Sequence, residues 1–246
     1  MIVITNGDLE KLKPMTRDSK GAYGKCFMYE DDKILKVFPY TRDFFCYRRE
    51  IKRNIKNSLG INIDGVSFPI DIAKTEGFNF SYIMPYIEGI SFNDLLDKVL
   101  NTDFNMTFED FINLYHSAIS KAYEIASYGI EMNDFHKNNC TINDDFTIGI
   151  FDVDFYKNKV LFNGVMEKYL RYYNMLEVNE AFFQMLVCIY NKKVKCCKSS
   201  EKNSELKKID KIIDKFPKNK PGYVDSVLLK INDEFKKDNI KDLILR

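Results

Sequence analysis

The apolar pattern of this 246-residue chain changes from strand-like to helical near residues 86–89, and this change constrains the fold more than any other feature. Within residues 9–38, the stretches KCFMY and KILKVF flank an acidic turn, as the strands of a hairpin would. Residues 41–59 place apolar side chains at helical spacing, and residues 61–86 return to short apolar runs. The order strands, helix, strands predicts a β-rich first part with one helix.

The residues after this change are predicted to be mainly helical. Thr107 and Asp110 form a capping-box pattern, and an apolar stripe at helical spacing follows them. Two short strand candidates, CTIN and TIGIF, come next, and helical patterns then dominate residues 165–190 and 205–246.

We therefore predict an α+β fold with a β-rich part, residues 1–86, and a mainly helical part, residues 87–246, which together form one domain. The 37 Lys and Arg nearly balance the 36 Asp and Glu, so no global field draws the chain to nucleic acid or to a membrane. Six scattered cysteines, no secretory leader and no long uncharged run predict a cytoplasmic protein with reduced thiols.

Small residues at the entrance of this hairpin offer one phosphate contact. Ser19, Gly21 and Gly24 carry no bulky side chain, so backbone amides near them can approach phosphate oxygens closely. An ordinary hairpin turn is the alternative. A Walker A loop is not expected, because these glycines are too close together and a strand follows them in place of a helix.

Lys36 lies inside an apolar strand candidate, where a solvated lysine is expected only on an outward face. If Lys36 is buried, Glu50 on the following helix is the obvious ionic partner. Such a pair would hold the ammonium group against phosphate oxygens.

Three polar residues in the second half of the chain are the most informative. Asp134 and Asn139 lie five residues apart on a loop after the long helix, and Asp152 follows a short apolar strand. This arrangement can place one carboxylate at a substrate hydroxyl and supply an amide and a carboxylate oxygen to a metal. Such hard oxygen ligands suit Mg²⁺ bridging the phosphates of ATP. The alternative is a set of polar turn residues without chemistry.

The order and spacing of these features resemble the protein-kinase superfamily over most of the chain. In the first part, Lys36 matches the lysine of the VAIK motif and Glu50 its partner on the helix. The nucleotide-binding positions implied by this resemblance are Ser19, Gly21 and Gly24 in the Gly-rich loop, Cys26 at its valine, Met84 as gatekeeper, and Pro85 and Ile87 in the hinge. In the second part, Asp134 and Asn139 match the HRDxxxxN motif, and Asp152 matches the aspartate of DFG.

The resemblance implies a bilobal protein-kinase-like fold, with an antiparallel β-rich lobe plus one helix and a mainly helical second lobe. It implies that Asp134 accepts the hydroxyl proton, that Lys36 holds the α- and β-phosphates of ATP, and that Asn139 and Asp152 coordinate Mg²⁺. The function it favours is a divergent Ser/Thr protein kinase.

The chain also departs from the kinase motifs. Met132 and Asn133 replace the His and Arg of HRD, and Val153 and Asp154 replace the Phe and Gly of DFG. His136 and the absence of an APE motif favour a small-molecule kinase of the aminoglycoside-phosphotransferase type as the alternative. A pseudokinase scaffold is a third possibility. The hydroxyl acceptor, on a protein or a small molecule, is not identified by the sequence.

Overall fold

The computed structural model describes residues 2–15, 24–102, 104–159, 163–196, 200–236 and 238–241. Its contacts divide the chain into two compact units. Unit 1 comprises residues 1–87 and 150–160, and unit 2 comprises residues 88–149 and 161–246. Residues 150–160 pack with unit 1, whereas the sequence pattern predicts that they belong to the mainly helical part. The reason is that Ile150 hydrogen-bonds through its backbone to Gly65 and Ser67, both of unit 1.

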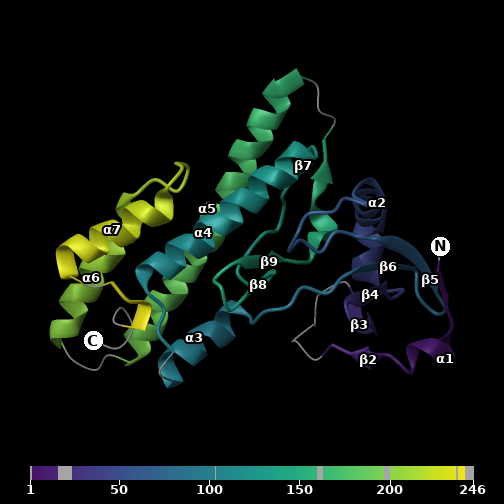
Figure 1. The fold of residues 1–246 in the computed structure, drawn as a ribbon, viewed down its shortest axis with the longest axis horizontal. Coiled ribbons are helices and arrows are strands. Elements are labelled where there is room, and N and C mark those ends of the chain that lie inside the picture. The colour runs from purple at the N-terminus through teal and green to yellow at the C-terminus, as the bar shows by residue number, and fades with distance from the viewer. Residues whose placement is uncertain are drawn as a thin grey trace. The chain divides into compact units, whose positions relative to one another are not determined.

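Unit 1 is built on a six-stranded sheet with the order β1-β5-β6-β4-β3-β2 (Figure 1). The strands are β1 (Ile2–Ile4), β2 (Lys13–Pro14), β3 (Lys25–Glu30), β4 (Lys33–Phe38), β5 (Asp71–Thr75) and β6 (Phe80–Pro85). The predicted hairpin is confirmed, because β3 and β4 pair antiparallel with Cys26 opposite Lys36. The sheet is largely antiparallel, as the expected antiparallel β-rich part requires, with one exception. The short strand β1 pairs in parallel with β5, which makes the sheet mixed.

Two helices and a short segment complete unit 1: α1 (Asn6–Leu9), α2 (Arg42–Asn57), and residues 150–160 with the 3₁₀ turn η1 (Val153–Phe155) and β10 (Lys157–Asn158). The helix predicted at residues 41–59 is confirmed as α2. Its Ile51 and Ile55 share one buried cluster with Ile34 and Phe38 of β4. Since side chains alternate along a strand, Lys36 lies on the same face of the sheet as Ile34 and Phe38, toward α2.

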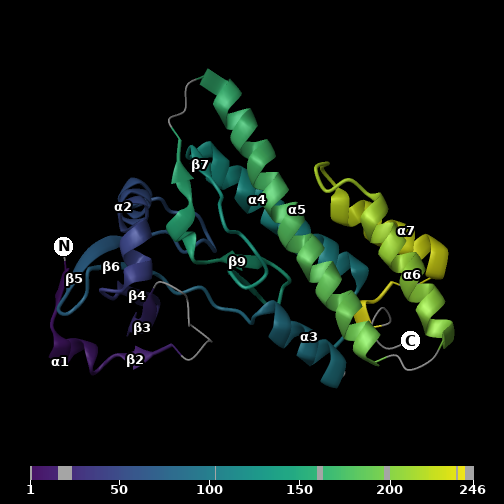
Figure 2. The same cartoon turned by 180° about the vertical axis from the view of Figure 1, so that it is seen from behind.

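Unit 2 is mainly helical, as predicted. Its elements are α3 (Phe92–Asn101), α4 (Phe108–Ser127), β7 (Ile130–Glu131), β8 (Cys140–Ile142), β9 (Ile148–Ile150, whose last residue belongs to unit 1), α5 (Asn163–Cys196), α6 (Ser200–Lys215) and α7 (Tyr223–Phe235). The predicted capping box of α4 is present, with hydrogen bonds in both directions between Thr107 and Asp110. Helices α4 and α5 lie side by side (Figures 1 and 2), and the ring of Phe182 packs against Phe111 and Tyr115. The chain is therefore an α+β protein.

Gly89, at the start of unit 2, lies very close to Ile142 and Asn143. Its φ is +120°, and a Cβ atom there would lie 2.8 Å from both Asn143 Oδ1 and the Ile142 carbonyl oxygen. Gly89→Ala is therefore expected to lower the free energy of unfolding by about 1–3 kcal/mol, measured by urea denaturation. Gly60→Ala is the matched control, because Gly60 also has positive φ but nothing within 4 Å of the added Cβ. Equal losses in the two variants would contradict the steric explanation.

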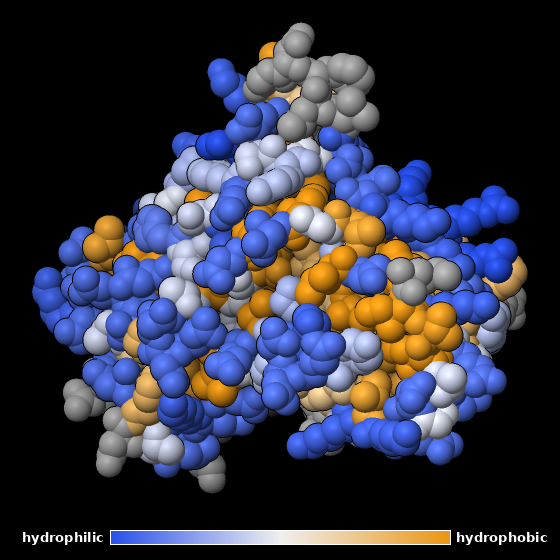
Figure 3. All heavy atoms as spheres, turned by 45° about the vertical axis from the view of Figure 1, so that its right-hand side comes forward, coloured by the Kyte–Doolittle hydropathy of each residue, from blue (hydrophilic) through white to orange (hydrophobic). Residues whose placement is uncertain are grey.

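The surface is mixed in character. On the face drawn in Figure 3, hydrophilic side chains surround several patches of hydrophobic ones. Among the described helices, none carries an apolar stretch of the length needed to cross a bilayer.

Candidate functional site

The structure distributes the predicted site residues over both units. Unit 1 holds Gly24, Cys26, Lys36, Glu50, Met84, Pro85, Ile87 and Asp152, and unit 2 holds Asp134 and Asn139. Ser19 and Gly21 lie outside the described residues.

Lys36 is buried and ion-paired. The residue is only 7% exposed, which rules out the alternative of an outward, solvated side chain. Its Nζ atom lies 2.5 Å from Asp152 Oδ1 and 2.6 Å from Asp154 Oδ2. Burial alone would lower the pKa of Lys36, but the two carboxylates raise it well above its ordinary value. The ammonium group is therefore charged inside the protein.

The expectation that Glu50 is the ionic partner of Lys36 is corrected by the structure. Glu50 pairs with Lys157 of β10, at a distance of 3.4 Å. The carboxylates that contact Lys36 come instead from the segment after β9, more than one hundred residues away along the chain. No local pattern around Lys36 could reveal such a partner.

Asp154 is the functional candidate that sequence reasoning missed. It is 2% exposed, and besides Lys36 it accepts a hydrogen bond of 2.6 Å from the Tyr82 hydroxyl of β6. Its backbone carbonyl accepts a hydrogen bond of 3.1 Å from the Asn54 side chain of α2. Burial raises the pKa of Asp154 to about 6, although Lys36 opposes this shift. The available signal was a second acid two residues after Asp152, within an otherwise apolar stretch.

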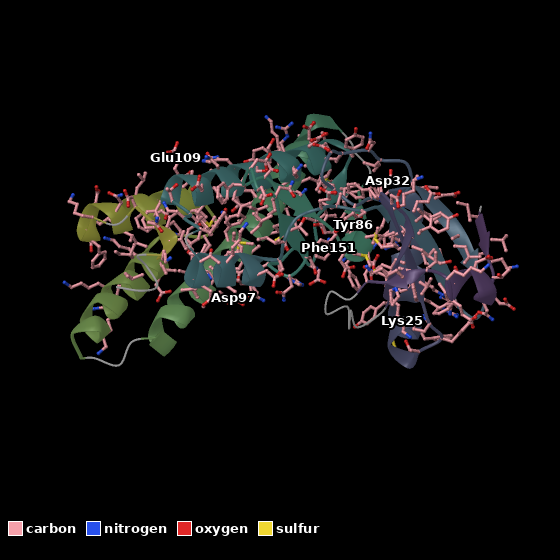
Figure 4. All side chains as sticks on the ribbon, turned by 60° about the horizontal axis from the view of Figure 1, so that its bottom comes forward. Lys25, Asp32, Tyr86, Asp97, Glu109 and Phe151 are labelled. Atoms are coloured by element: carbon pink, nitrogen blue, oxygen red, sulfur yellow. The ribbon has the colours of Figure 1, made fainter. Side chains whose placement is uncertain are left out.

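Asp152 adopts a left-handed backbone conformation, with φ 60° and ψ 52°, at the start of η1. It directly follows Phe151, which is labelled in Figure 4. Left-handed conformations are uncommon for residues other than glycine and cluster at functional sites, and aspartate is among the residues that tolerate them best. The Asp152 side chain is one-third exposed, so it can reach a ligand that arrives from solvent.

Gly24 approaches Lys36 closely at the start of β3. A Cβ atom at Gly24 would lie 3.2 Å from Lys36 Cε and 3.3 Å from the ring of Phe38. A side chain at position 24 would therefore crowd Lys36 and Phe38 of the neighbouring strand β4. Cys26 follows, and burial raises the pKa of its thiol to about 11, so the thiolate form is disfavoured at neutral pH.

The predicted adenine-contacting residues lie at the end of β6. Met84 is buried opposite Ile34 of β4. The Pro85 carbonyl accepts a hydrogen bond of 2.8 Å from Ser67 Oγ. Since a carbonyl oxygen has two lone pairs, this bond leaves capacity for a second donor. Ile87 follows as a half-buried residue at the end of this part of unit 1.

Asp134 and Asn139 lie on one loop of unit 2 and are connected by a hydrogen bond. Asp134 has φ 65°, the second left-handed aspartate among the predicted site residues, and its side chain is 52% exposed. The side-chain amide nitrogen of Asn139 donates a 2.8 Å hydrogen bond to the Asp134 carbonyl. This bond uses the nitrogen, so the Asn139 oxygen is the atom suited to a metal. His136 lies beside them, with Nε2 3.7 Å from Asp134 Oδ1.

Asn174 of α5 anchors the start of this loop. It is fully buried, accepts a hydrogen bond from the Met132 amide at 2.8 Å, and donates to the carbonyls of Ala122 and Ile130. Asn174→Ala would leave buried backbone groups without partners, which costs about 1–3 kcal/mol. We expect faster hydrogen exchange at the Met132 amide and a lower melting temperature than in the exposed control Asn138→Ala. Unchanged exchange at Met132 would refute the anchoring role.

Asp152 in unit 1 and Asn139 in unit 2 each carry an oxygen atom of the kind that Mg²⁺ prefers. Among the described residues, no group of three or more His, Cys, Asp or Glu could hold a metal. Mg²⁺ in nucleotide sites is bound by one or two protein carboxylates together with phosphate oxygens, so it needs no such cluster.

No protein-family model matches the chain, and no curated protein matches it either.

Proposed function

We propose that this chain is an ATP-dependent phosphotransferase with a bilobal protein-kinase-like fold, which transfers the γ-phosphate of Mg-ATP to the hydroxyl of a protein Ser or Thr. The observation that carries the proposal is the buried Lys36, held charged by Asp152 in a left-handed turn. Burying an ion pair brings little or no stability compared with apolar residues of similar volume. The burial of the Lys36 charge therefore calls for a role beyond folding.

A charged lysine beside a partly exposed aspartate suits the binding of a metal–nucleotide complex. The ammonium group of Lys36 can pair with phosphate oxygens, and the Asp152 carboxylate can serve Mg²⁺. Gly24 carries no side chain that would crowd Lys36 from the neighbouring strand. In this proposal Met84, Pro85 and Ile87 serve the adenine.

The loop of unit 2 supplies the acceptor chemistry in this proposal. Asp134 accepts the proton of the attacking hydroxyl, and Asn139 gives its amide oxygen to the metal. The bound Mg²⁺ would neutralise charge on the phosphate oxygens. The hydrogen bond from Asn139 to the Asp134 carbonyl holds these two residues in a fixed relation before substrate binds.

A small-molecule acceptor is the second candidate. The helix α5 begins at Asn163, soon after η1 ends at Phe155, which leaves a short segment where protein kinases hold their peptide substrates. His136 beside Asp134 also differs from the usual protein-kinase loop. A panel of peptides and hydroxylated small molecules distinguishes the two acceptors.

Binding of Mg-ATP tests the nucleotide half of the proposal. ATP with Mg²⁺ is expected to raise the melting temperature, because a ligand present at about 100 times its dissociation constant stabilises the native state by about 2.7 kcal/mol. Asp152→Asn should lose the part of this shift that depends on Mg²⁺. The matched control is Asp144→Asn, whose side chain is 99% exposed. A melting temperature that ATP and Mg²⁺ leave unchanged would count against the proposal.

A further inference from the structure

We infer that Asp154 is the positioning residue that holds Lys36 for the phosphates of ATP, in place of a glutamate on α2. This inference rests on the proposed function for its catalytic meaning. Its structural content, that Asp154 fixes the Lys36 side chain, stands on the contacts within unit 1 alone.

Asp154 is the buried carboxylate that contacts Lys36, and it is held in place at both of its oxygens. Its Oδ2 atom lies 2.6 Å from Lys36 Nζ, and both side chains are almost wholly buried. The other carboxylate oxygen accepts the hydrogen bond from Tyr82, so strands β4 and β6 both fix its orientation. A carboxylate held at both oxygens in a buried site has little freedom to move away.

Glu50 is engaged elsewhere. Its carboxylate pairs with Lys157, and both side chains of this pair are about one-third exposed. Such a solvated pair is worth little energetically, so it does not place Glu50 rigidly. Helix α2 reaches the Lys36 cluster by another route, because Asn54 donates to the Asp154 carbonyl at 3.1 Å.

In this arrangement Asp152 and Asp154 have different roles, one toward the metal and the other toward Lys36. Asp152 is partly exposed and is the residue proposed for the metal, whereas Asp154 is closed off from solvent. When Asp152 serves a metal, Lys36 keeps Asp154 as its remaining carboxylate. The position of Lys36 therefore depends on α2 through Asn54 and the Asp154 backbone, and not through Glu50.

The test compares Asp154→Asn with Glu50→Gln, two isosteric changes that each remove one negative charge. Asp154→Asn is expected to raise the KM for ATP about tenfold or more, since one partner of a buried charge pair is lost, with the KM for the acceptor unchanged. Glu50→Gln should stay within about threefold of the native protein. Tyr82→Phe removes only the hydrogen bond to Asp154 and leaves the charges in place, so it should raise this KM less than Asp154→Asn does. The reverse ranking of Asp154→Asn and Glu50→Gln would overturn the inference.

A second readout does not depend on phosphate transfer. Lys36 in the native protein should resist acylation by an amine-reactive reagent followed by mass spectrometry, since it is buried and protonated. Asp154→Asn should expose Lys36 to labelling, and Glu50→Gln should leave it protected. If Asp154→Asn does not fold, Asn54→Ala takes its place with the same expected direction. Native protein that transfers no phosphate would defeat the proposed function, whereas protected Lys36 in Asp154→Asn or its substitute would defeat the inference alone.

Discussion

Lys36→Met is expected to lower the free energy of unfolding by about 3–5 kcal/mol, because removing one partner of a buried ion pair leaves the other charge uncompensated. The uncompensated group is Asp154, which is 2% exposed and cannot be solvated where it lies. The Asp154 carboxylate can lose its negative charge only by taking up a proton. For a carboxyl group with an unfolded pKa of about 3.9, this uptake costs about 4 kcal/mol at pH 7.

The sign of the pH dependence identifies this mechanism. In Lys36→Met the native state binds a proton on Asp154 that the unfolded state does not bind at neutral pH. Stability should therefore recover by about 1.4 kcal/mol for each pH unit below 7, until the unfolded carboxyl group is also protonated. Urea denaturation between pH 5 and 7 measures this slope. The double variant Lys36→Met with Asp154→Asn should regain much of the loss at pH 7, and a loss under about 1 kcal/mol in Lys36→Met would contradict the account.

Asp134→Asn is expected to lower kcat for phosphate transfer by about 10²–10⁴-fold, since an amide cannot accept the proton of the attacking hydroxyl. The Asp134 side chain is 52% exposed, so the change should leave the fold and the KM for ATP nearly unaltered. A steady-state assay with ATP as the varied substrate separates these parameters. Exposed Asp144→Asn is again the matched control, and a kcat for Asp134→Asn equal to that of this control would remove Asp134 from the mechanism.

The features predicted correctly from the sequence are those set by neighbouring residues. The hairpin of β3 and β4, the helix α2 and the capping box at Thr107 depend on local periodicity and on contacts a few residues apart. Such signals need no knowledge of the rest of the fold.

The features that were missed depend on distant parts of the chain. The three residues of β1 form a strand only because β5, about seventy residues later, offers a parallel edge. Asp154 became a partner of Lys36 only because residues 150–160 pack with unit 1. The expected partner Glu50 had the right charge on the right helix, but the structure pairs it with Lys157. Tertiary packing decided each case, and local sequence carries no signal of it.

The candidate site also combines features that the local sequence predicts with features that only tertiary packing determines. The sequence singled out Lys36, Asp134, Asn139 and Asp152 by residue type and order along the chain. The structure adds how the residues of each unit are held: Lys36 by two carboxylates, and Asp134 by the amide of Asn139. The hydrogen-bond partners of a buried group depend on its tertiary surroundings, so these contacts could not be predicted from motifs.

The most direct test of the central claim is transfer of the γ-phosphate from radiolabelled ATP in the presence of Mg²⁺, with the protein itself, generic peptides and hydroxylated small molecules as acceptors. We predict labelled product with at least one acceptor, lost when Mg²⁺ is removed and lost in both Asp134→Asn and Asp152→Asn. Labelled peptide or protein would establish a protein kinase, and label confined to small molecules would establish the second candidate. No transfer to any acceptor, together with no stabilisation by Mg-ATP, would contradict the account.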